Sequence, residues 1–367
     1  MRFNEGFLNS MHEAMTLLRT RGAAEATEMI QRALRGETAG AVNGTASRDR
    51  APETVAFPIA DTKIKEAPAH KVREDCIDVE DRGRFSTLAY SNAAGLRQYR
   101  LYVPTGTDSE PLPLIVLLHG CTQDADDFAA GTQMNALAEL HRCLVAYPVQ
   151  PKRANPSKCW NWFKPDDQHR ERGEPSLIAG ITREIIAAHN VDPARVYIAG
   201  MSAGGAMAAT MIAAYPELYA AAGVHSGLPA RCAHDLPSAL AAMKGGKPPG
   251  KARSATRDTG SSPQRPMIVF HGDADATVHI SNAERLVHGF DALPDVDREG
   301  RRVREGRRAC TVSRRVSADG IDAELWTIHG APHAWAGGNA RGSYTDPAGP
   351  DASAEMLRFF LDHPKRQ

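Results

Sequence analysis

The sequence predicts an α/β fold built on a doubly wound, mostly parallel sheet, and three observations point to it. Short, nearly continuous apolar segments alternate along the chain with segments of helical composition. Such apolar segments are typical of strands that helices cover on both faces. A glycine-rich turn at 200–204 joins one of these strands to a helix. The expected strands are 100–103, 114–118, 143–147, 195–199, 221–224, 267–270 and 324–328, and the expected helices are 125–140, 176–189, 205–212 and 351–361.

The first 80 residues do not follow this alternation. Apolar residues recur at helical spacing over 7–35, which predicts a helical appendage of two short amphipathic helices within 1–35. Residues 36–80 are rich in Ala, Thr, Pro, Glu and Lys without periodicity, and we expect a flexible linker there. The α/β domain then spans 81–367. We expect the appendage to serve docking or homo-oligomerisation rather than catalysis.

Each expected element of the α/β domain has a local reason. The segment 114–118 contains only leucine, isoleucine and valine and ends at a His-Gly pair. The helix over 205–212 consists mainly of alanine and methionine, and it must end before Pro216. The last helix, 351–361, begins at Asp351, which is a suitable N-cap residue.

An insertion over about 228–264 interrupts the alternation. The segment is rich in Gly, Pro, Lys and Ser, and it contains a short predicted helix near 236–243. In enzymes of this architecture such insertions lie above the strand ends and act as lids that shape the substrate groove. A disordered surface loop is the alternative interpretation.

The most informative stretch is the turn Gly200-Met201-Ser202-Ala203-Gly204. A serine that has glycine two residues away on both sides, between a strand and a helix, is the nucleophile elbow of α/β-hydrolases. The turn is so sharp that neighbouring backbone segments leave no room for Cβ atoms at the glycines. The following helix directs its positive end toward an anion forming at the serine. The sequence therefore predicts an α/β-hydrolase with Ser202 as its nucleophile.

The acid that supports this serine is expected after one of the later strands. In this fold the catalytic order along the chain is Ser, then Asp or Glu, then His. The strand 267–270 runs into a loop that offers Asp273 and Asp275. The spacing His-Gly-x-x-Asp-x-x-Val favours Asp275, whereas Asp273 is expected to cap or hydrogen-bond the turn. We expect His271, at the strand end, to be a packed histidine.

The base is expected after the last strand, 324–328. Two histidines follow that strand, His329 and His333. His329 still lies at the strand end, whereas His333 lies in a loop with glycine and proline that can reach back over the sheet. We therefore predict that His333 is the general base, oriented by Asp275.

Acyl transfer also requires two backbone N–H donors for the tetrahedral intermediate. One is expected from Ala203, directly after the nucleophile, and the other from Cys121, in the loop after the strand 114–118. Cys121 as a nucleophile is the alternative, and its place outside the elbow disfavours that role. The predicted reaction is ester hydrolysis through an acyl-enzyme on Ser202, with no metal and no organic cofactor required.

The cysteines give no sign of a metal site. The chain contains six, and none forms a CxxC pair, which disfavours zinc and a small disulfide scaffold. Free thiols are expected in a reducing compartment, and a pairing of two of them remains open. The six are Cys76, Cys121, Cys143, Cys159, Cys232 and Cys310.

The charge and hydropathy of the chain give no support for a nucleic-acid-binding, membrane-spanning or secreted protein. Lys and Arg total 44, as do Asp and Glu, so net charge favours neither a nucleic-acid partner nor an anionic membrane. The sequence contains no run of about 20 apolar residues that could span a membrane. The N-terminus carries acidic residues and lacks the continuous apolar region of a secretory signal. We therefore expect a cytoplasmic protein.

An aromatic stretch, Cys159-Trp160-Asn161-Trp162-Phe163, lies in a long loop between a strand and a helix. Packing in the core is one interpretation, because aromatic side chains bury large areas. An aromatic wall beside the active site is the other, and we favour it. Trp160, Trp162 and Trp335 are accordingly predicted to contact the substrate.

Taken together, these motifs resemble those of the polyhydroxybutyrate depolymerase family of serine esterases, the branch shared with feruloyl and acetylxylan esterases. The resemblance covers roughly 85–362 and implies Ser202, Asp275 and His333 as a catalytic triad. It also implies short-chain polyhydroxyalkanoates or their oligomers as substrates. The matching runs are Leu118-His119-Gly120-Cys121-Thr122-Gln123, Ala146-Tyr147-Pro148, Cys159-Trp160-Asn161-Trp162-Phe163, Gly200-Met201-Ser202-Ala203-Gly204-Gly205, His271-Gly272-Asp273-Ala274-Asp275 and Gly330-Ala331-Pro332-His333-Ala334-Trp335.

The sequence departs from secreted members of that family, which have a signal peptide and often a separate substrate-binding domain. We therefore expect granule-associated polymer, soluble oligomers or small esters as substrates. The alternative among enzymes is a feruloyl or acetylxylan-type esterase. The alternative from another class is a non-catalytic protein that binds polymer granules.

Overall fold

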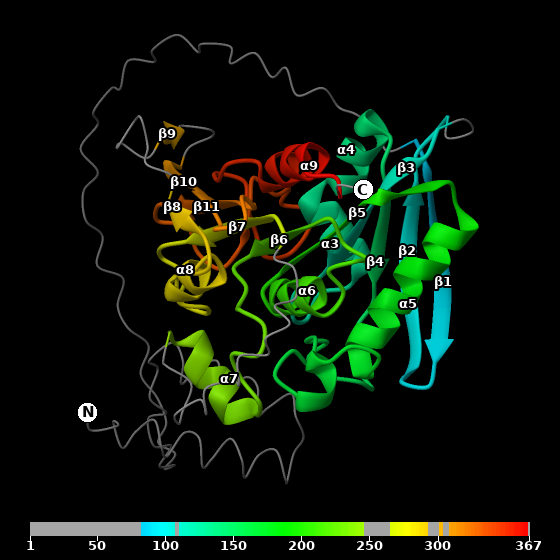
Figure 1. Cartoon of the computed structure of the whole chain (residues 1–367), viewed down its shortest axis with the longest axis horizontal. Helices are drawn as coiled ribbons and strands as arrows, with labels where there is room; N and C mark the ends of the chain where they lie inside the picture. Colours follow the sequence, from blue (N-terminus) through cyan, green and yellow to red (C-terminus); the bar gives the residue numbers. More distant parts are fainter. Residues whose placement is uncertain (1–81, 107–109, 246–264, 293–300, 304–307, 366–367) are drawn as a thin grey trace, which may run out of the picture.

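The computed structural model describes residues 82–106, 110–245, 265–292, 301–303 and 308–365 (Figure 1). The predicted appendage, the predicted linker and the part of the insertion over 246–264 lie outside the described residues. Oligomerisation through the appendage therefore stays a prediction. Within the described ranges, no helix combines the length and apolarity needed to cross a membrane.

The described part of the chain contains an 11-stranded sheet in the order β1-β2-β4-β3-β5-β6-β7-β11-β10-β8, with β9 paired to β10. The central strands β4, β3, β5, β6, β7 and β11 are parallel, and the flanking pairs are antiparallel. The bounds are β1 Arg84–Asn92, β2 Gly95–Val103, β3 Leu112–Leu118, β4 Leu144–Pro148, β5 Val191–Met201, β6 Ala221–His225, β7 Met267–Gly272, β8 Asp291–Ala292, β9 Arg301–Val303, β10 Cys310–Val316 and β11 Asp322–Ile328. The predicted mostly parallel sheet is thus confirmed.

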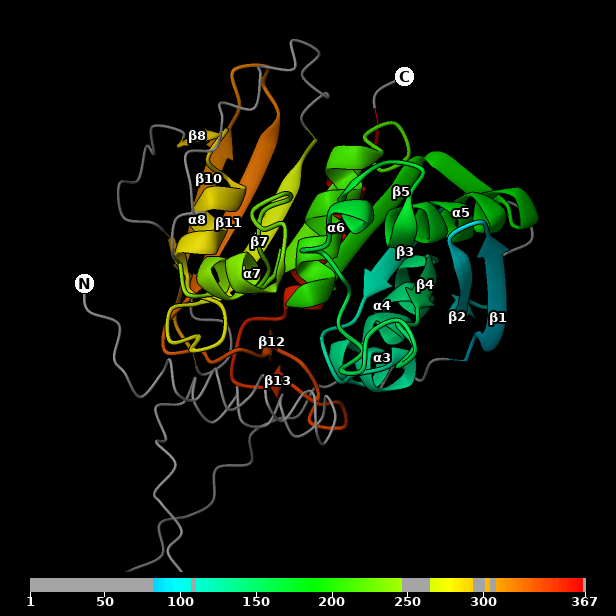
Figure 2. The same ribbon diagram turned by 90° about the horizontal axis from the view of Figure 1, so that it is seen from below.

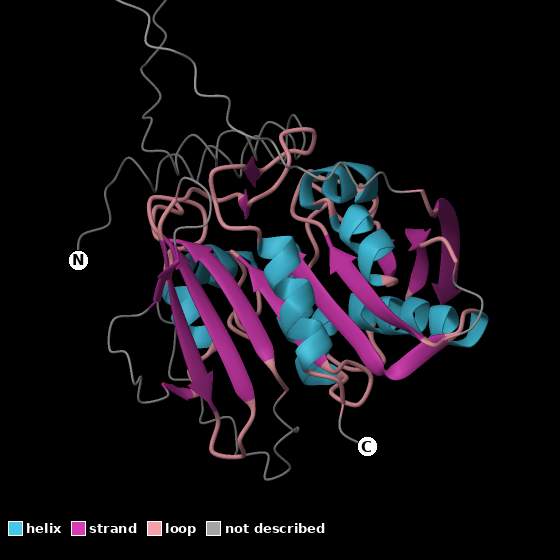
Figure 3. Ribbon diagram, turned by 90° about the horizontal axis from the view of Figure 1, so that it is seen from above, coloured by secondary structure: helices cyan, strands magenta, loops and turns pink. Residues whose placement is uncertain are grey.

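Helices cover both faces of this sheet (Figure 3). Side chains on successive residues of a strand point to opposite faces. Accordingly, Leu114 and Val116 belong to a core cluster with α5 and α6, whereas Ile115 and Leu117 belong to a second cluster with α3 and α9. The bounds are α3 Ala125–Thr132, α4 Met134–His141, η1 Pro165–Gln168, α5 Gly173–Ala188, α6 Ala203–Ala214, α7 Leu236–Met243, α8 Ser281–Leu286 and α9 Ala352–Asp362.

One predicted helix is in fact two. The expected helix over 125–140 is interrupted at Gln133, whose backbone is left-handed, with φ 55° and ψ 21°. The Gln133 amide donates to the Ala129 carbonyl and ends α3, and α4 then begins at Met134. The short helix predicted near 236–243 is present as α7.

The carboxyl ends of the parallel strands bring the predicted site residues to one edge of the sheet. β3 runs into the loop with Cys121, β5 into Ser202, β7 into Asp275 and β11 into the loop with His333. A separate two-stranded parallel sheet, β12 Trp335–Ala336 and β13 Thr345–Asp346, follows that last loop (Figure 2).

Candidate active site

The predicted nucleophile elbow has a strained backbone. Ser202 has φ 55° and ψ −118°, which a non-glycine residue rarely adopts. The Ser202 amide donates to the His225 carbonyl at 2.9 Å, and the Ser202 carbonyl accepts from the Ala206 amide at 2.9 Å. Strain of this kind persists only where the surroundings hold it, and it is concentrated at functional sites.

The flanking glycines are required by close approach of the backbone. A Cβ atom on Gly204 would collide with the carbonyl oxygens of Leu118 and His119, and one on Gly200 would collide with the Gly204 backbone. The loop after β3 therefore lies directly against the start of α6. This contact places the predicted oxyanion loop beside the nucleophile.

The predicted base and acid are hydrogen-bonded. His333 Nδ1 lies 2.7 Å from Asp275 Oδ2, and the exposed fractions of the two side chains are 13% and 0%. The same carboxylate accepts from the amides of Thr277 and Val278, each at 2.9 Å. With its proton on Nδ1, facing the carboxylate, the imidazole presents Nε2 as a proton acceptor.

The hydrogen bonds of Asp275 outweigh its burial and favour the charged form of its carboxyl group. Burial acts to raise the pKa of Asp275, but the hydrogen bond and charge of His333 and the Val278 amide together hold that pKa below its ordinary value. Asp275 also lies 3.5 Å from Nε2 of the buried His271, which is hydrogen-bonded to the Val278 carbonyl. The carboxylate is thus fixed on several sides.

The structure does not join all three predicted triad members by hydrogen bonds. Asp275 and His333 are paired, but no hydrogen bond links Ser202 Oγ to His333 or to another side chain among the described residues. In unliganded hydrolases the contact between nucleophile and base is often loose and tightens when substrate binds. The triad therefore stays a prediction supported by two of its three members.

The alternative acid and base form a separate pair. Asp273 Oδ2 lies 2.8 Å from His329 Nδ1, and these side chains are 39% and 42% exposed. Asp273 also accepts from the Gly330 amide at 2.6 Å, and His329 Nε2 lies 2.8 Å from Thr311 Oγ1. Asp273 thus hydrogen-bonds the turn, as its position in the sequence suggests.

The two predicted oxyanion donors have free amides. A Cβ atom on Gly120 would lie 3.6 Å from Ser202 Cβ, so the loop residue before Cys121 faces the nucleophile. Neither the Cys121 nor the Ala203 amide donates a hydrogen bond within the described part of the chain. Two unpaired N–H groups beside the serine can stabilise a developing oxyanion.

The expectation of free thiols is wrong for two of the cysteines. Cys121 and Cys159 form a disulfide whose Cα atoms lie 4.2 Å apart. The Thr122 amide also donates to the Ser157 carbonyl at 2.7 Å, so the oxyanion loop is tied to the loop that carries the aromatic stretch. A sequence separation of 38 residues gives no sign of such pairing. Cys143 and Cys232 keep free thiols.

The structure does not support the predicted aromatic wall. Trp160, Trp162 and Trp335 are 0%, 6% and 1% exposed, which leaves no indole face for a substrate. The loop is drawn inward because the buried carboxylate of Glu174 accepts from both the amide and the side chain of Asn161, at 2.7 and 2.6 Å. The core-packing interpretation is therefore the correct one for these tryptophans.

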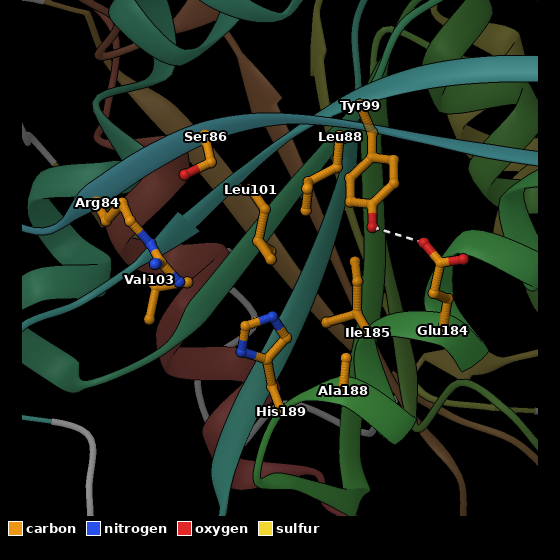
Figure 4. Close-up of a pocket in the computed structure, with 10 residues that line it drawn as sticks. All are labelled: Arg84, Ser86, Leu88, Tyr99, Leu101, Val103, Glu184, Ile185, Ala188 and His189. Atoms are coloured by element: carbon orange, nitrogen blue, oxygen red, sulfur yellow. Dashed lines mark hydrogen bonds between the residues drawn. The ribbon is translucent and has the colours of Figure 1, made fainter.

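A surface groove of about 370 Å³ lies elsewhere in the molecule (Figure 4). It is formed by the β1–β2 hairpin and the end of α5, and Tyr99 and Glu184 are hydrogen-bonded at its rim, at 2.9 Å. No predicted site residue lines it. The groove therefore does not belong to the candidate active site.

Sequence reasoning missed His225, which contacts both Ser202 and the loop that carries His333. Its carbonyl accepts from Ser202, and its ring nitrogen Nε2 accepts from the Ala336 amide at 3.0 Å. The only signal in the sequence is its position at the end of a buried strand, where it follows the predicted strand 221–224 directly.

Comparison with known proteins identifies the family of this chain. The family model described as Esterase PHB depolymerase matches residues 97–312. Poly(3-hydroxyalkanoate) depolymerase C from Paucimonas lemoignei is 37% identical over 217 residues, which is 56% of this chain and 52% of the relative. Acetylxylan esterase A from Talaromyces purpureogenus is 31% identical over 202 residues, which is 52% of each chain. The chain thus spans about half the length of these curated relatives.

A solved structure supports the fold. Acetyl xylan esterase from Aspergillus awamori superimposes with a TM-score of 0.58 at 20% sequence identity, and the match covers 76% of this chain and 99% of that one. The predicted α/β-hydrolase fold is therefore confirmed.

Proposed function

The chain belongs to the esterase PHB depolymerase family, and on that premise we propose that it hydrolyses short-chain polyhydroxyalkanoates or their oligomers through an acyl-enzyme on Ser202. One observation carries the catalytic part of the proposal. The imidazole of His333 is bonded at 2.7 Å to the buried carboxylate of Asp275, at the sheet edge where Ser202 occupies a strained elbow. An imidazole oriented by a buried carboxylate is the base that activates a serine hydroxyl once the two come into hydrogen-bond contact.

The proposed reaction begins when Ser202 Oγ attacks the ester carbonyl carbon and its proton passes to His333 Nε2. Asp275 keeps the imidazole in the required tautomer and stabilises the imidazolium that forms. The amides of Cys121 and Ala203 donate to the oxyanion. The intermediate collapses, His333 returns the proton to the leaving alcohol, and the acyl group stays on Ser202. Water then repeats these steps and releases the acid.

The substrate class rests on the relatives' names. Similarity to a poly(3-hydroxyalkanoate) depolymerase supports a polyester or oligoester substrate. Similarity to an acetylxylan esterase supports the second candidate, an esterase of acetylated glycans or feruloyl esters. Hydrolysis rates measured side by side on a 3-hydroxybutyrate trimer, acetylated xylan and methyl ferulate distinguish the two candidate functions. Turnover of the trimer at least tenfold above the others supports the first candidate, and the reverse order overturns it.

Ser202→Ala tests the catalytic part. We expect turnover of the preferred ester to fall by about 10³-fold or more, because only binding and the oxyanion donors remain. Labelling by an organophosphonate must be lost in the same variant. Turnover within tenfold of wild type would contradict the proposal. A folded wild-type protein that neither reacts with the phosphonate nor hydrolyses any ester would favour the non-catalytic, granule-binding alternative.

The compartment is also open to experiment. We propose that the chain acts inside the cell, on granule-associated polymer or soluble oligomers. Disulfides such as Cys121–Cys159 are more common in oxidising compartments, so the state of this pair in living cells tests the proposal. Alkylation of thiols before lysis, followed by mass spectrometry, measures that state. Alkylated Cys121 and Cys159 support a reducing location, and a protected pair contradicts it.

A further inference from the structure

His225 is placed to connect the nucleophile with the base. It is the last residue of β6, it is completely buried, and it belongs to neither the predicted triad nor the predicted oxyanion hole. Its carbonyl accepts from the Ser202 amide at 2.9 Å. Its ring nitrogen Nε2 accepts from the Ala336 amide at 3.0 Å, three residues beyond His333. One residue therefore holds the elbow through its backbone and the loop of the base through its side chain.

The ring itself is held in a single orientation. It is stacked between Trp335, at a centroid distance of 5.1 Å and an interplanar angle of 24°, and Phe270, at 5.8 Å and 10°. Its Nδ1 lies 3.2 Å from Ser226 Oγ. An amide N–H can only donate, so Nε2 must carry the lone pair and Nδ1 the proton.

The surroundings of the His225 ring favour its neutral form, in which Nε2 can accept a hydrogen bond. Burial, followed by the nearby His271 and His333, lowers the pKa of His225 to about 3. A neutral imidazole with a fixed tautomer is thus available to the Ala336 amide throughout the neutral range. Protonation in this environment would break that hydrogen bond.

The loop that carries His333 is anchored at its other end as well. Asp273 accepts from the Gly330 amide at 2.6 Å, and Arg308 donates to the Gly330 carbonyl at 2.7 Å. Gly330 and Ala336 are therefore hydrogen-bonded on either side of His333, and the amide and indole of Trp335 are held in addition by Tyr344 and Ser353. Loss of the His225 acceptor removes one of these contacts and leaves the Ala336 amide without its partner.

We propose that His225 is a positioning residue that sets the separation between Ser202 and His333, an inference that rests on the proposed function. Ser202 and His333 form no hydrogen bond in the described structure, so the base must approach the nucleophile when substrate binds. Because His225 holds the Ala336 end of this loop, the His333 ring has only a short way to move toward Ser202. A catalytic side chain that is misplaced by about 1 Å can lower a rate by about 100-fold.

Two variants of His225 separate the hydrogen bond from the packing. His225→Phe keeps a ring between Trp335 and Phe270 but removes the acceptor. His225→Gln can present its side-chain oxygen to the Ala336 amide at a reach similar to that of Nε2. We expect kcat to fall by about 30- to 100-fold in His225→Phe with KM within about threefold, and to recover to within about fivefold of wild type in His225→Gln.

Tyr197→Phe is the matched control. Tyr197 is a fully buried ring on β5, and its hydroxyl has no hydrogen-bond partner within the part of the chain that the structure describes. The change removes one buried polar atom from the sheet without touching the site, and kcat should stay within twofold of wild type. Wild-type kcat in folded His225→Phe would overturn the inference. A kcat for His225→Gln as low as that of His225→Phe would overturn it equally.

A measurement on the unmodified protein covers the case in which His225→Phe fails to fold. Nitrogen-15 NMR of the histidine rings reports which nitrogen carries the proton. We expect a ring that stays neutral below pH 4.5, with Nε2 unprotonated and Nδ1 protonated, and that is absent from the spectrum of His225→Gln. The buried ring of His119, whose Nε2 accepts from the Gln150 amide, has the same tautomer, and its signal must persist in that variant. A proton on Nε2 of the His225 ring would contradict the inference. Ser202→Ala is assayed beside these variants, so that a failure of the proposed function can be told from a failure of the inference about His225. Wild-type turnover in Ser202→Ala refutes the proposed function, whereas wild-type turnover in His225→Phe refutes only the inference.

Discussion

Two pairs of aspartate and histidine lie in the same two loops of this molecule, and they differ chiefly in burial. Asp275–His333 and Asp273–His329 have nearly the same hydrogen-bond distances, 2.7 and 2.8 Å. The carboxylate is 0% exposed in the first pair and 39% exposed in the second. Residue type and spacing therefore do not distinguish the two pairs, whereas their surroundings do.

The difference in burial has a chemical consequence. A buried carboxylate interacts strongly with an imidazolium, because little water screens the charges. An exposed pair is screened, and its contribution to stability or catalysis is small. Under the proposed mechanism, Asp275 can therefore stabilise the charge that forms on His333. The exposed pair instead fastens the loop through Gly330 and Thr311.

The largest difference is expected when each aspartate loses its charge. Asp275→Asn leaves His333 without a carboxylate and favours the wrong tautomer, so kcat should fall by about 10³- to 10⁴-fold. Asp273→Asn should lower kcat by no more than about tenfold, since it only loosens one anchor of the loop. Steady-state kinetics on one soluble ester measure both. Equal losses in the two variants would remove the distinction between the pairs.

A smaller difference is expected in stability at acidic pH. The pKa of Asp275 lies below its ordinary value despite burial, because His333 and the Val278 amide favour the charged form. Such a group stabilises the folded state above its unfolded pKa of about 4, and that stability is lost as pH falls through the lower folded value. Urea unfolding between pH 5 and 2 should show a weaker pH dependence in Asp275→Asn than in wild type. Asp273→Asn should change it less, and the opposite order would contradict this account.

The smallest effect is expected at Thr311. Its hydroxyl, His329 and Asp273 are joined in the order of a catalytic triad, at 2.8 Å for each contact. We attribute no nucleophilic role to Thr311, because it is half-buried within a sheet strand, β10, and does not lie on an elbow. Thr311→Val should leave kcat within twofold of wild type and change the free energy of unfolding by about 1 kcal/mol or less. A loss of turnover comparable to that of Asp275→Asn would identify a second reacting hydroxyl.

Features of the structure that depend on backbone crowding or on the hydrophobic pattern could be predicted from the sequence. Gly200 and Gly204 signal the elbow because the backbone around them leaves no room for a side chain. Apolar runs such as β3 signal buried parallel strands because both of their faces are covered. The interruption of the predicted helix at Gln133 was not predictable, since a left-handed glutamine carries no sequence signal comparable to glycine.

Features that depend on contacts between distant residues were beyond the sequence. An indole has the same composition on a substrate wall and in a core, so only its surroundings placed Trp160 and Trp335 inside. The Cys121–Cys159 disulfide joins loops whose proximity the spacing does not reveal. His225 acquires its contacts from two other segments, and neither is adjacent to it in the sequence.

The central claim is that the buried pair, rather than the exposed one, activates Ser202. The most direct measurement is the second-order rate constant for inactivation by an organophosphonate in wild type, His333→Ala and His329→Ala. We predict a decrease of about 10³-fold or more in His333→Ala and of at most about tenfold in His329→Ala. Rapid inactivation of folded His333→Ala, or an equal decrease in His329→Ala, would contradict the claim.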